Sequence, residues 1–118
     1  MLVVQTYVDR SSIHGLGLFA AEDIPADTII WVFDPRMDSI ICKDEIADVP
    51  EHVFAYLTKY AWTDDDGNWR IGLDNDKFVN HSDTPNSIFL KTEYIFVTVC
   101  DIEKGEEITQ DYSTFSES

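Results

Sequence analysis

The 118-residue sequence has little positive charge: 8 Lys and Arg residues stand against 23 Asp and Glu residues, which gives a net charge of −15. Proteins that bind a nucleic-acid backbone need a basic patch, so this shortage argues against direct nucleic-acid binding. An acidic surface attracts cationic partners over long distances, but acidity also serves solubility alone. The charge is therefore compatible with a basic protein partner and, equally, with no partner.

Cysteine and long apolar runs are also scarce. Cys42 and Cys100 lack metal-ligand spacing, so we expect no metal site. We expect both to be buried free thiols in a reducing compartment, unless the fold brings the two cysteines together as a disulfide. No segment approaches the ~18 apolar residues of a membrane span. The first residues, "MLVVQTYV", have no basic region and indicate a strand rather than a signal peptide. We expect one soluble, cytoplasmic domain over residues 1–118, since no linker or low-complexity run divides the chain.

Short segments rich in β-branched and aromatic residues dominate the chain, and they predict strands. These segments are Val3 to Val8, Thr28 to Phe33, Trp69 to Leu73, Ser87 to Leu90 and Tyr94 to Ile102. One helix is predicted after Pro50, where Val53, Phe54, Leu57 and Tyr60 recur at helical spacing. The sequence thus predicts a mainly β (α+β) fold with one short helix.

Turn signals separate these segments. The run "DDDGN" at Asp64 to Asn68 predicts a hairpin tip. Two similar octapeptides, "DIPADTII" and "DIEKGEEI", carry Asp27 and Gly105 at the same place. Both residue types tolerate the left-handed backbone of a tight turn, so a turn is expected at each.

Three polar or glycine-containing stretches are candidates for a site, and each has an ordinary structural explanation. In "HGLGLFA" (14–20), Gly15 and Gly17 let a backbone approach a ligand closely, or mark a β-bulge. In "NHSDTPN" (80–86), Asn80 and His81 are ligand contacts or turn and capping residues. In "GEEITQDYSTF" (105–115), a strand leads to Tyr112, which by itself would be a packing residue.

In this order and at these separations, the three stretches resemble the SET-domain family of protein-lysine methyltransferases, in a minimal, stand-alone form of the kind found in bacteria and viruses. The resemblance covers about residues 3–115. It implies small curved sheets (a β-clip-like SET fold) and a C-terminal pseudoknot, in which the last segment threads beneath an earlier loop beside the Asn-His motif. It also implies S-adenosylmethionine as cofactor and a basic, lysine-containing protein segment as substrate.

The resemblance also assigns roles to residues. Tyr112 is the implied active-site tyrosine, whose hydroxyl lies near the transferred methyl group. Tyr60 resembles a second tyrosine of the lysine channel, although a core residue at a helix end is an equal alternative. The implied cofactor contacts are His14, Gly15, Leu16, Gly17, Asn80, His81, Tyr112 and Phe115.

The sequence departs from the family pattern at two places. Gln110 occupies the channel position where family members commonly carry Phe or Tyr, so the number of methyl groups added stays open. Only six residues follow Tyr112, and Phe115 is the apolar one that could cover the site, so a homodimer that completes the site is a further expectation. The cysteine-rich flanking segments of the family are absent. The leading hypothesis is an S-adenosylmethionine-dependent lysine methyltransferase; the alternative is a catalytically inactive SET-like module that binds a basic protein or peptide.

Overall fold

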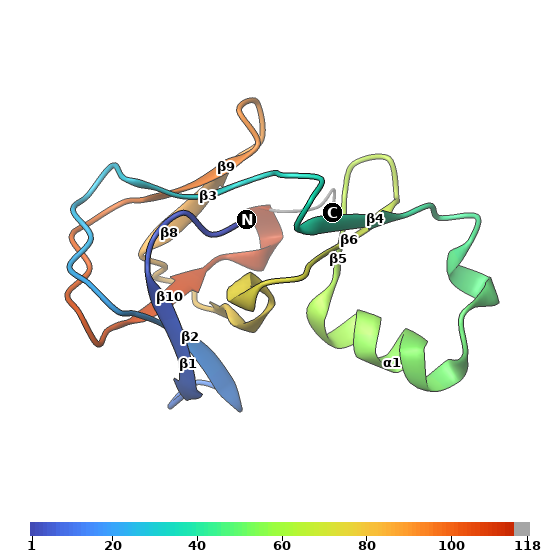
Figure 1. Cartoon of the computed structure of the whole chain (residues 1–118), viewed down its shortest axis with the longest axis horizontal. Helices are drawn as coiled ribbons and strands as arrows, with labels where there is room; N and C mark the ends of the chain where they lie inside the picture. Colours follow the sequence, from blue (N-terminus) through green and yellow to red (C-terminus); the bar gives the residue numbers. More distant parts are fainter. Residues whose placement is uncertain (115–118) are drawn as a thin grey trace.

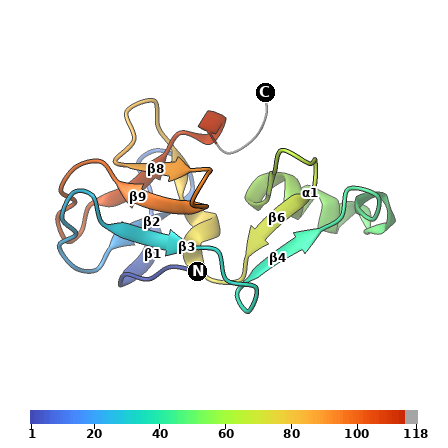
Figure 2. The same cartoon turned by 90° about the horizontal axis from the view of Figure 1, so that it is seen from above.

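The computed structural model describes residues 1–114, in which ten strands form three small sheets and a single α-helix is present. Two of the sheets, with strand orders β1-β2-β10-β7 and β3-β9-β8, make up what we call the β core. The third sheet, β4-β6-β5, and helix α1 form what we call the insert, residues 38–72. The β core and the insert lie side by side, with the N-terminus at their boundary (Figures 1 and 2).

The strands are short. Those of the β core are β1 (Thr6–Arg10), β2 (Leu16–Ala20), β3 (Ile29–Val32), β7 (Asn80–His81), β8 (Ser87–Leu90), β9 (Ile95–Thr98) and β10 (Glu107–Gln110). Those of the insert are β4 (Asp38–Ile41), β5 (Trp62–Thr63) and β6 (Trp69–Gly72). Helix α1 spans Glu51–Tyr60, and the 3₁₀ turns are η1 (Ile46–Asp48), η2 (Asn75–Phe78) and η3 (Tyr112–Thr114).

Apolar side chains from several strands fill the interior of the β core. Leu18, Ile30 and Ile108 are fully buried, and Ile102 is nearly so. Each comes from a segment that alternates or runs apolar, as strands with one or both faces covered do. This interior fixes the position of β10 and therefore of the residues that follow it.

Strand β10 connects distant parts of the chain. It pairs antiparallel with β2 and parallel with β7, so that Gln110 lies opposite His81. It also bonds to both ends of the loop after β7: the Ser82 amide donates to the Gln110 carbonyl (2.9 Å), and the Asn86 side chain donates to the Glu107 carbonyl (2.8 Å). These are the contacts that the expected pseudoknot requires.

The insert is held by polar and aromatic contacts rather than by a deep apolar interior. Among the helical residues of α1, Leu57 is the buried one. The Arg70 guanidinium lies over the rings of Tyr94 (4.6 Å) and Phe33 (5.3 Å) and bonds to Asp64 (2.8 Å). Burial would raise the pKa of Asp64, but the bonds from Arg70 and from backbone amides outweigh it and lower the pKa. Arg70 thus attaches the insert to the β8–β9 turn.

Most of the predicted elements are confirmed. Helix α1 begins directly after Pro50, and β8 has the predicted bounds. Asp27 (φ 61°) and Gly105 (φ 93°) have the expected left-handed backbone, and Gly67 (φ 81°) forms the tip of the β5–β6 hairpin. The first strand is shifted: it begins at residue 6 rather than 3. Strand β4 was not anticipated at all.

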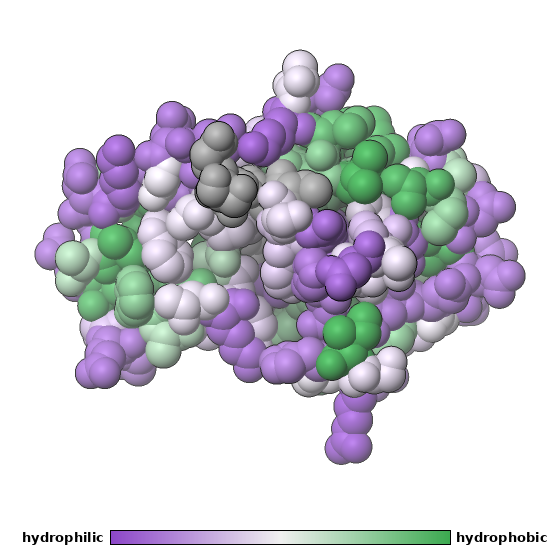
Figure 3. All heavy atoms as spheres, turned by 180° about the vertical axis from the view of Figure 1, so that it is seen from behind, coloured by the Kyte–Doolittle hydropathy of each residue, from purple (hydrophilic) through white to green (hydrophobic). Residues whose placement is uncertain are grey.

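The surface is largely hydrophilic, with separate apolar patches (Figure 3). Both cysteines are free, but Cys100 is exposed, so its predicted burial is wrong. Over the described part of the chain, no helix is long and apolar enough to cross a membrane.

Candidate functional site

The three candidate stretches of the sequence meet at one end of the sheet that contains β10. The parallel pairing of β10 with β7 brings residues 110–112 beside Asn80 and His81. The connection between β1 and β2, which contains His14 and Gly15, lies against the same place through the Asn80 side chain. The predicted site residues are therefore neighbours in space, except for Phe115, which lies outside the described residues.

Asn80 holds this junction together. Its side-chain nitrogen, Nδ2, lies 3.1 Å from the His14 carbonyl oxygen, 3.0 Å from that of Leu16 and 2.9 Å from Glu107 Oε2. A primary amide has two hydrogens, so these three acceptors share them. The side-chain nitrogen of Asn80 is thus occupied by the protein and its backbone belongs to the β7–β10 ladder, so its side-chain oxygen is the group that could contact a ligand.

Glu107 is a structural member of the junction that sequence analysis did not select. Its carboxylate accepts hydrogen bonds from Ser11 Oγ (2.7 and 2.9 Å) as well as from Asn80. Gly17 is required beside it: a Cβ at that position would lie 2.4 Å from Glu107 Oε2. Gly17 therefore makes room for this carboxylate, and among the predicted cofactor contacts it has the clearest structural task.

His81 positions the start of the C-terminal segment. Its Nδ1 accepts a hydrogen bond from the Tyr112 backbone amide (3.1 Å), and its Nε2 lies 2.9 Å from Asp83 Oδ1. Because an amide can only donate, the neutral tautomer with a hydrogen on Nε2 satisfies both contacts. The ring also meets the Tyr112 ring edge-on, with centroids 5.3 Å apart.

Tyr112 is fixed at both ends. In addition to the amide contact, its hydroxyl donates a hydrogen bond to the Val79 carbonyl. Burial, and secondarily the Glu107 carboxylate, raise the pKa of this hydroxyl above its ordinary value. Tyr112 is consequently a neutral, oriented hydroxyl near physiological pH, although 45% of the residue is exposed.

Two cavities meet at Tyr112. The first, which we call the hairpin cavity, has a volume of about 490 Å³. It is lined by Ile13, His14, Gly15, Leu16, Lys59, Tyr60, Lys77, Phe78, Val79, Asn80, His81 and Tyr112. Every predicted cofactor contact that the structure describes is in this set, apart from Gly17. Its volume suits a drug-sized molecule, since ligand pockets measure ~300–1,000 Å³.

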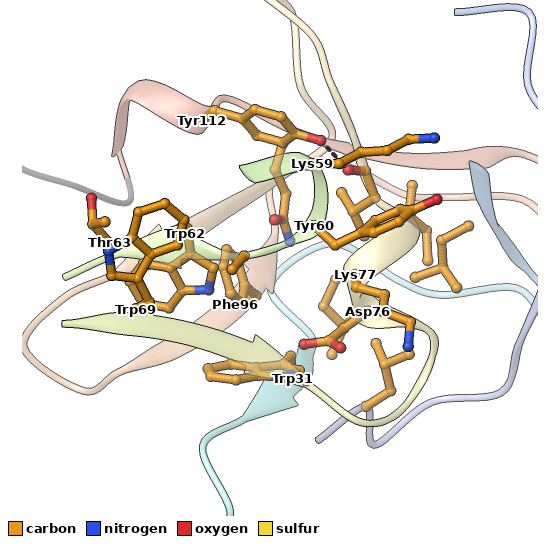
Figure 4. Close-up of a pocket in the computed structure, with 18 of the residues that line it drawn as sticks. Trp31, Lys59, Tyr60, Trp62, Thr63, Trp69, Asp76, Lys77, Phe96 and Tyr112 are labelled. Atoms are coloured by element: carbon orange, nitrogen blue, oxygen red, sulfur yellow. Dashed lines mark hydrogen bonds between the residues drawn. The ribbon is translucent and has the colours of Figure 1, made fainter. Parts of the chain in front are cut away.

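The second cavity, which we call the aromatic cavity, has a volume of about 320 Å³ and lies between the β core and the insert. The rings of Trp31, Tyr60, Trp62, Trp69 and Phe96 contribute to its wall, together with Gln110 and Asp76 (Figure 4). Both predicted channel residues, Tyr60 and Gln110, are among the lining residues. Tyr60 and Tyr112 line both cavities, as do Lys59, Lys77 and Val79, so the two cavities adjoin at these residues.

Asp76 is the acidic group of the aromatic cavity, and sequence analysis missed it. Burial, and then a hydrogen bond with Asp74, raise its pKa to about 8. Its Oδ1 is buried without a hydrogen-bond partner within residues 1–114. A Cβ on Gly72 would lie 2.0 Å from that oxygen, so the backbone of β6 leaves space for this carboxyl. No motif distinguishes Asp76 from the other acidic residues of the chain.

The polar groups that line the two cavities include the side-chain amides of Asn80 and Gln110, the imidazoles of His14 and His81, tyrosine hydroxyls, two lysine ammonium groups and the Asp76 carboxyl. Within the described range, no group of three His, Cys, Asp or Glu residues could hold a metal ion. The composition of the hairpin cavity, with glycine backbone on one side and polar groups on the other, suits a nucleoside-sized organic molecule.

Comparison with known proteins gives the following matches. A family profile described as "SET domain" matches residues 15–113. The human and mouse proteins named "Histone-lysine N-methyltransferase 2D" are each 27% identical over 124 residues, an alignment that includes 90% of this chain. The chain spans only 2% of the length of these curated relatives. A solved structure from Plasmodium falciparum, described as a "putative histone methyltransferase", superposes with a TM-score of 0.66 at 26% identity and covers 93% of this chain and 94% of that one.

Proposed function

The chain belongs to the SET-domain family of protein-lysine methyltransferases, and from this membership we propose that it is an S-adenosylmethionine-dependent protein-lysine N-methyltransferase acting on a basic protein segment. The observation that carries the proposal is the place of Tyr112, an oriented hydroxyl at the boundary of two cavities of different character. The hairpin cavity suits the cofactor, and the aromatic cavity suits the target lysine.

The residues that would hold the cofactor are the backbone at His14 to Leu16, the free side-chain oxygen of Asn80, His81 and Tyr112. When bound, S-adenosylmethionine would supply the methyl group of its sulfonium to an in-line neutral amine and would leave as the neutral thioether S-adenosylhomocysteine. The chain's own contribution is alignment by hydrogen bonds. His81 holds the Tyr112 amide, the Val79 carbonyl holds the Tyr112 hydroxyl, and Asn80 holds the β1–β2 connection. Such alignment is a large part of the catalysis of displacement reactions.

The aromatic cavity can prepare the attacking amine. A lysine side chain has an ordinary pKa of ~10.4, whereas only its neutral form is a nucleophile. Tyr60, Trp62, Trp69 and Phe96 surround it with low-polarity surface, and desolvation favours the neutral amine. The net charge of −15 attracts a lysine-rich segment to the protein as a whole.

The proposal is tested by exchanging Tyr112 for phenylalanine. Tyr112→Phe removes the hydroxyl but keeps the ring, so we expect kcat for methyl incorporation into basic proteins to fall at least ~10-fold with little change in KM. Tyr7→Phe is the matched control, because Tyr7 lies on β1, stacked on Phe19 and away from both cavities. Full activity of folded Tyr112→Phe would remove the assigned role.

A second candidate function, an inactive module that binds a basic protein or peptide, is favoured by Gln110. This residue is only 5% exposed and places an amide in the aromatic cavity where the family commonly has an aromatic ring. Calorimetry with S-adenosylmethionine, followed by a methyl-incorporation assay with mixed basic proteins, separates the two functions. Binding of a basic protein without any methyl transfer would select the module.

The remaining partner predictions stay predictions. Self-association into a homodimer should strengthen with salt, because salt screens the mutual repulsion of two acidic chains. Sedimentation at low and at moderate ionic strength measures it, and the same samples with added duplex DNA test the expected lack of nucleic-acid binding.

A further inference from the structure

His81 makes a hydrogen bond that only its neutral form can make. Its Nδ1 lies 3.1 Å from the backbone nitrogen of Tyr112, and a backbone amide can only donate. Nδ1 must therefore offer a lone pair, which it has in the neutral ring and lacks in the imidazolium, where both ring nitrogens are donors. Protonation of His81 is consequently incompatible with this bond.

Carboxylates for a protonated His81 are already close. Asp83 Oδ1 lies 2.9 Å from Nε2, and Asp111 Oδ1 lies 3.7 Å from Nδ1, just beyond hydrogen-bond distance. Hydrogen bonds from Ser113 hold the pKa of Asp111 below its ordinary value, so this group is a carboxylate over the range in which histidine titrates. The imidazolium thus has a carboxylate near each nitrogen, whereas the neutral ring holds the Tyr112 amide.

The His81 side chain is accessible to protons, since 42% of it is exposed. From β10, Glu107 contacts its neighbour Asn80. The other titratable groups that line the hairpin cavity together with His81 are His14, Lys59, Tyr60, Lys77 and Tyr112. Of these residue types, histidine is the one that ordinarily changes charge between pH 5 and 8. A test must therefore separate His81 from His14.

The exchange of partners would act directly on Tyr112. The amide contact is one of those that orient this residue, and the bond from its hydroxyl to the Val79 carbonyl is another. The rings of His81 and Tyr112 also meet edge-on, with centroids 5.3 Å apart, so a His81 ring that turns toward Asp111 changes this contact as well. Because Tyr112 lines both cavities, its release alters the whole site.

We propose that His81 is a pH switch: on protonation it exchanges the Tyr112 amide for the Asp111 carboxylate, and the site then loses its affinity for the cofactor. The effect on the cofactor rests on the proposed function, whereas the exchange of hydrogen bonds does not. The binding-competent fraction of the protein falls about 10-fold for each pH unit below the midpoint of the His81 titration, so the apparent Kd should rise about 10-fold per unit.

The exchange of partners is tested without a ligand, by NMR of the wild-type protein from about pH 7.5 down to about pH 5.5. The Tyr112 amide proton should move upfield as it loses its acceptor, with the same midpoint as the ring protons of His81. In His81→Asn, the side-chain oxygen takes the place of Nδ1 and does not titrate, so the Tyr112 amide shift should stay constant. A wild-type Tyr112 amide that does not follow the His81 titration would overturn the inference.

The consequence for the site is tested by calorimetry with S-adenosylhomocysteine from about pH 7.0 down to about pH 5.5, where the amino group of this compound keeps most of its charge. It has no sulfonium, so the result does not depend on repulsion between a sulfonium and the imidazolium. The wild-type affinity should fall about 10-fold per unit below the His81 midpoint, whereas that of folded His81→Asn should change less than about twofold.

His52→Asn is the matched control. His52 is exposed on helix α1 and lines neither cavity, so this variant should have the same pH dependence as the wild type. A pH response that persists in folded His81→Asn would assign the effect to His14 and overturn the inference, as would a wild-type affinity that does not change with pH. If the wild type binds neither S-adenosylhomocysteine nor S-adenosylmethionine at any pH, the proposed function fails, and the NMR titration still decides whether His81 exchanges its partners.

Discussion

The β core and the insert are stabilised in different ways, and the candidate site lies where they meet. The β core surrounds fully buried aliphatic side chains such as Leu18, Ile30 and Ile108. The insert buries Leu57 from its helix and is attached through Arg70, which combines ring contacts with an ion pair. The aromatic cavity consequently has one wall from a well-packed sheet and one from a smaller, more polar unit.

This difference indicates a division of tasks. Residues that hold Tyr112 and the β1–β2 connection belong to the β core, where packing keeps their geometry constant. Tyr60, Trp62 and Trp69 belong to the insert, whose attachment involves fewer buried groups. We infer that the wall of the site contributed by the β core is the more rigid and that the wall contributed by the insert is the more adaptable.

The largest effect is expected from a cavity in the β core. Ile108→Ala should lower the free energy of unfolding by ~2–5 kcal/mol, because Ile108 is completely buried on β10. Urea unfolding followed by circular dichroism measures the loss. Phe54→Ala in the insert is the comparison: Phe54 is 41% exposed, so its loss should be clearly smaller. Equal losses would contradict the distinction between the two regions.

A smaller effect is expected when the attachment of the insert is broken. Arg70→Met leaves the Asp64 carboxylate buried without its ion-pair partner, held by the backbone amides of Asp66 and Asn68 alone, which should cost ~1–3 kcal/mol. Hydrogen exchange should show faster exchange of the β5 and β6 amides, with those of β2 and β10 unchanged. Arg36→Met is the control. The Arg36 side chain is 80% exposed, so the loss of its ion pair with Asp34 should have no effect on stability. Uniformly faster exchange across both regions would show that they unfold as one unit.

The smallest effect concerns pH. The pKa of Asp76 is raised to about 8 in the folded protein, against ~3.9 in an unfolded chain. Between these values the folded state binds more protons, so this group makes the protein less stable as pH rises. At pH 8, Asp76→Asn should therefore have a free energy of unfolding about 1 kcal/mol or more above that of the wild type, and a higher melting temperature. At pH 5 the difference in stability between the two proteins should be smaller.

The groups that face Asp76 bear on this prediction. Asp74 and Asp38 raise its pKa, and the amino group of Met1 lowers it. Asp44→Asn, at an exposed position of the insert, removes a carboxyl of ordinary surroundings and serves as the control. A pH profile of Asp76→Asn parallel to that of the wild type would show that Asp76 ionises without cost at the boundary of the two regions.

Local sequence signals predicted the elements but not all of the contacts between them. The β-rich composition of residues 87–90, the helical spacing after Pro50 and the turn residues Asp27 and Gly105 each act within a few positions, and all were predicted. Strand β4 was missed because "DSII" is stabilised by its pairing with β6 rather than by its own propensity. Similarly, the residues of β2 were interpreted as a glycine-containing stretch and not as a strand. The lack of a side chain at position 17 makes room for Glu107, which lies 90 positions later in the sequence.

The candidate site was predictable to a similar extent. The family motifs located Asn80, His81 and Tyr112, which the structure brings together. Asp76 belongs to no motif, and its meaning depends on its burial beside Asp74 and Asp38, which only the fold reveals. Charged residues are common in this sequence, so single ones carry little information before their surroundings are known.

The parallel pairing of β7 with β10 also has a consequence for biosynthesis. Residues 107–110 lie between β2 and β7, so the sheet that contains Leu18 and Asn80 cannot close until this late segment has emerged from the ribosome. Contacts of such large sequence separation form slowly, because chain entropy is lost before they are gained. During translation the apolar side of β2 therefore remains uncovered until residues 107–110 have followed it, and a nascent chain stalled before residue 107 should bind chaperones.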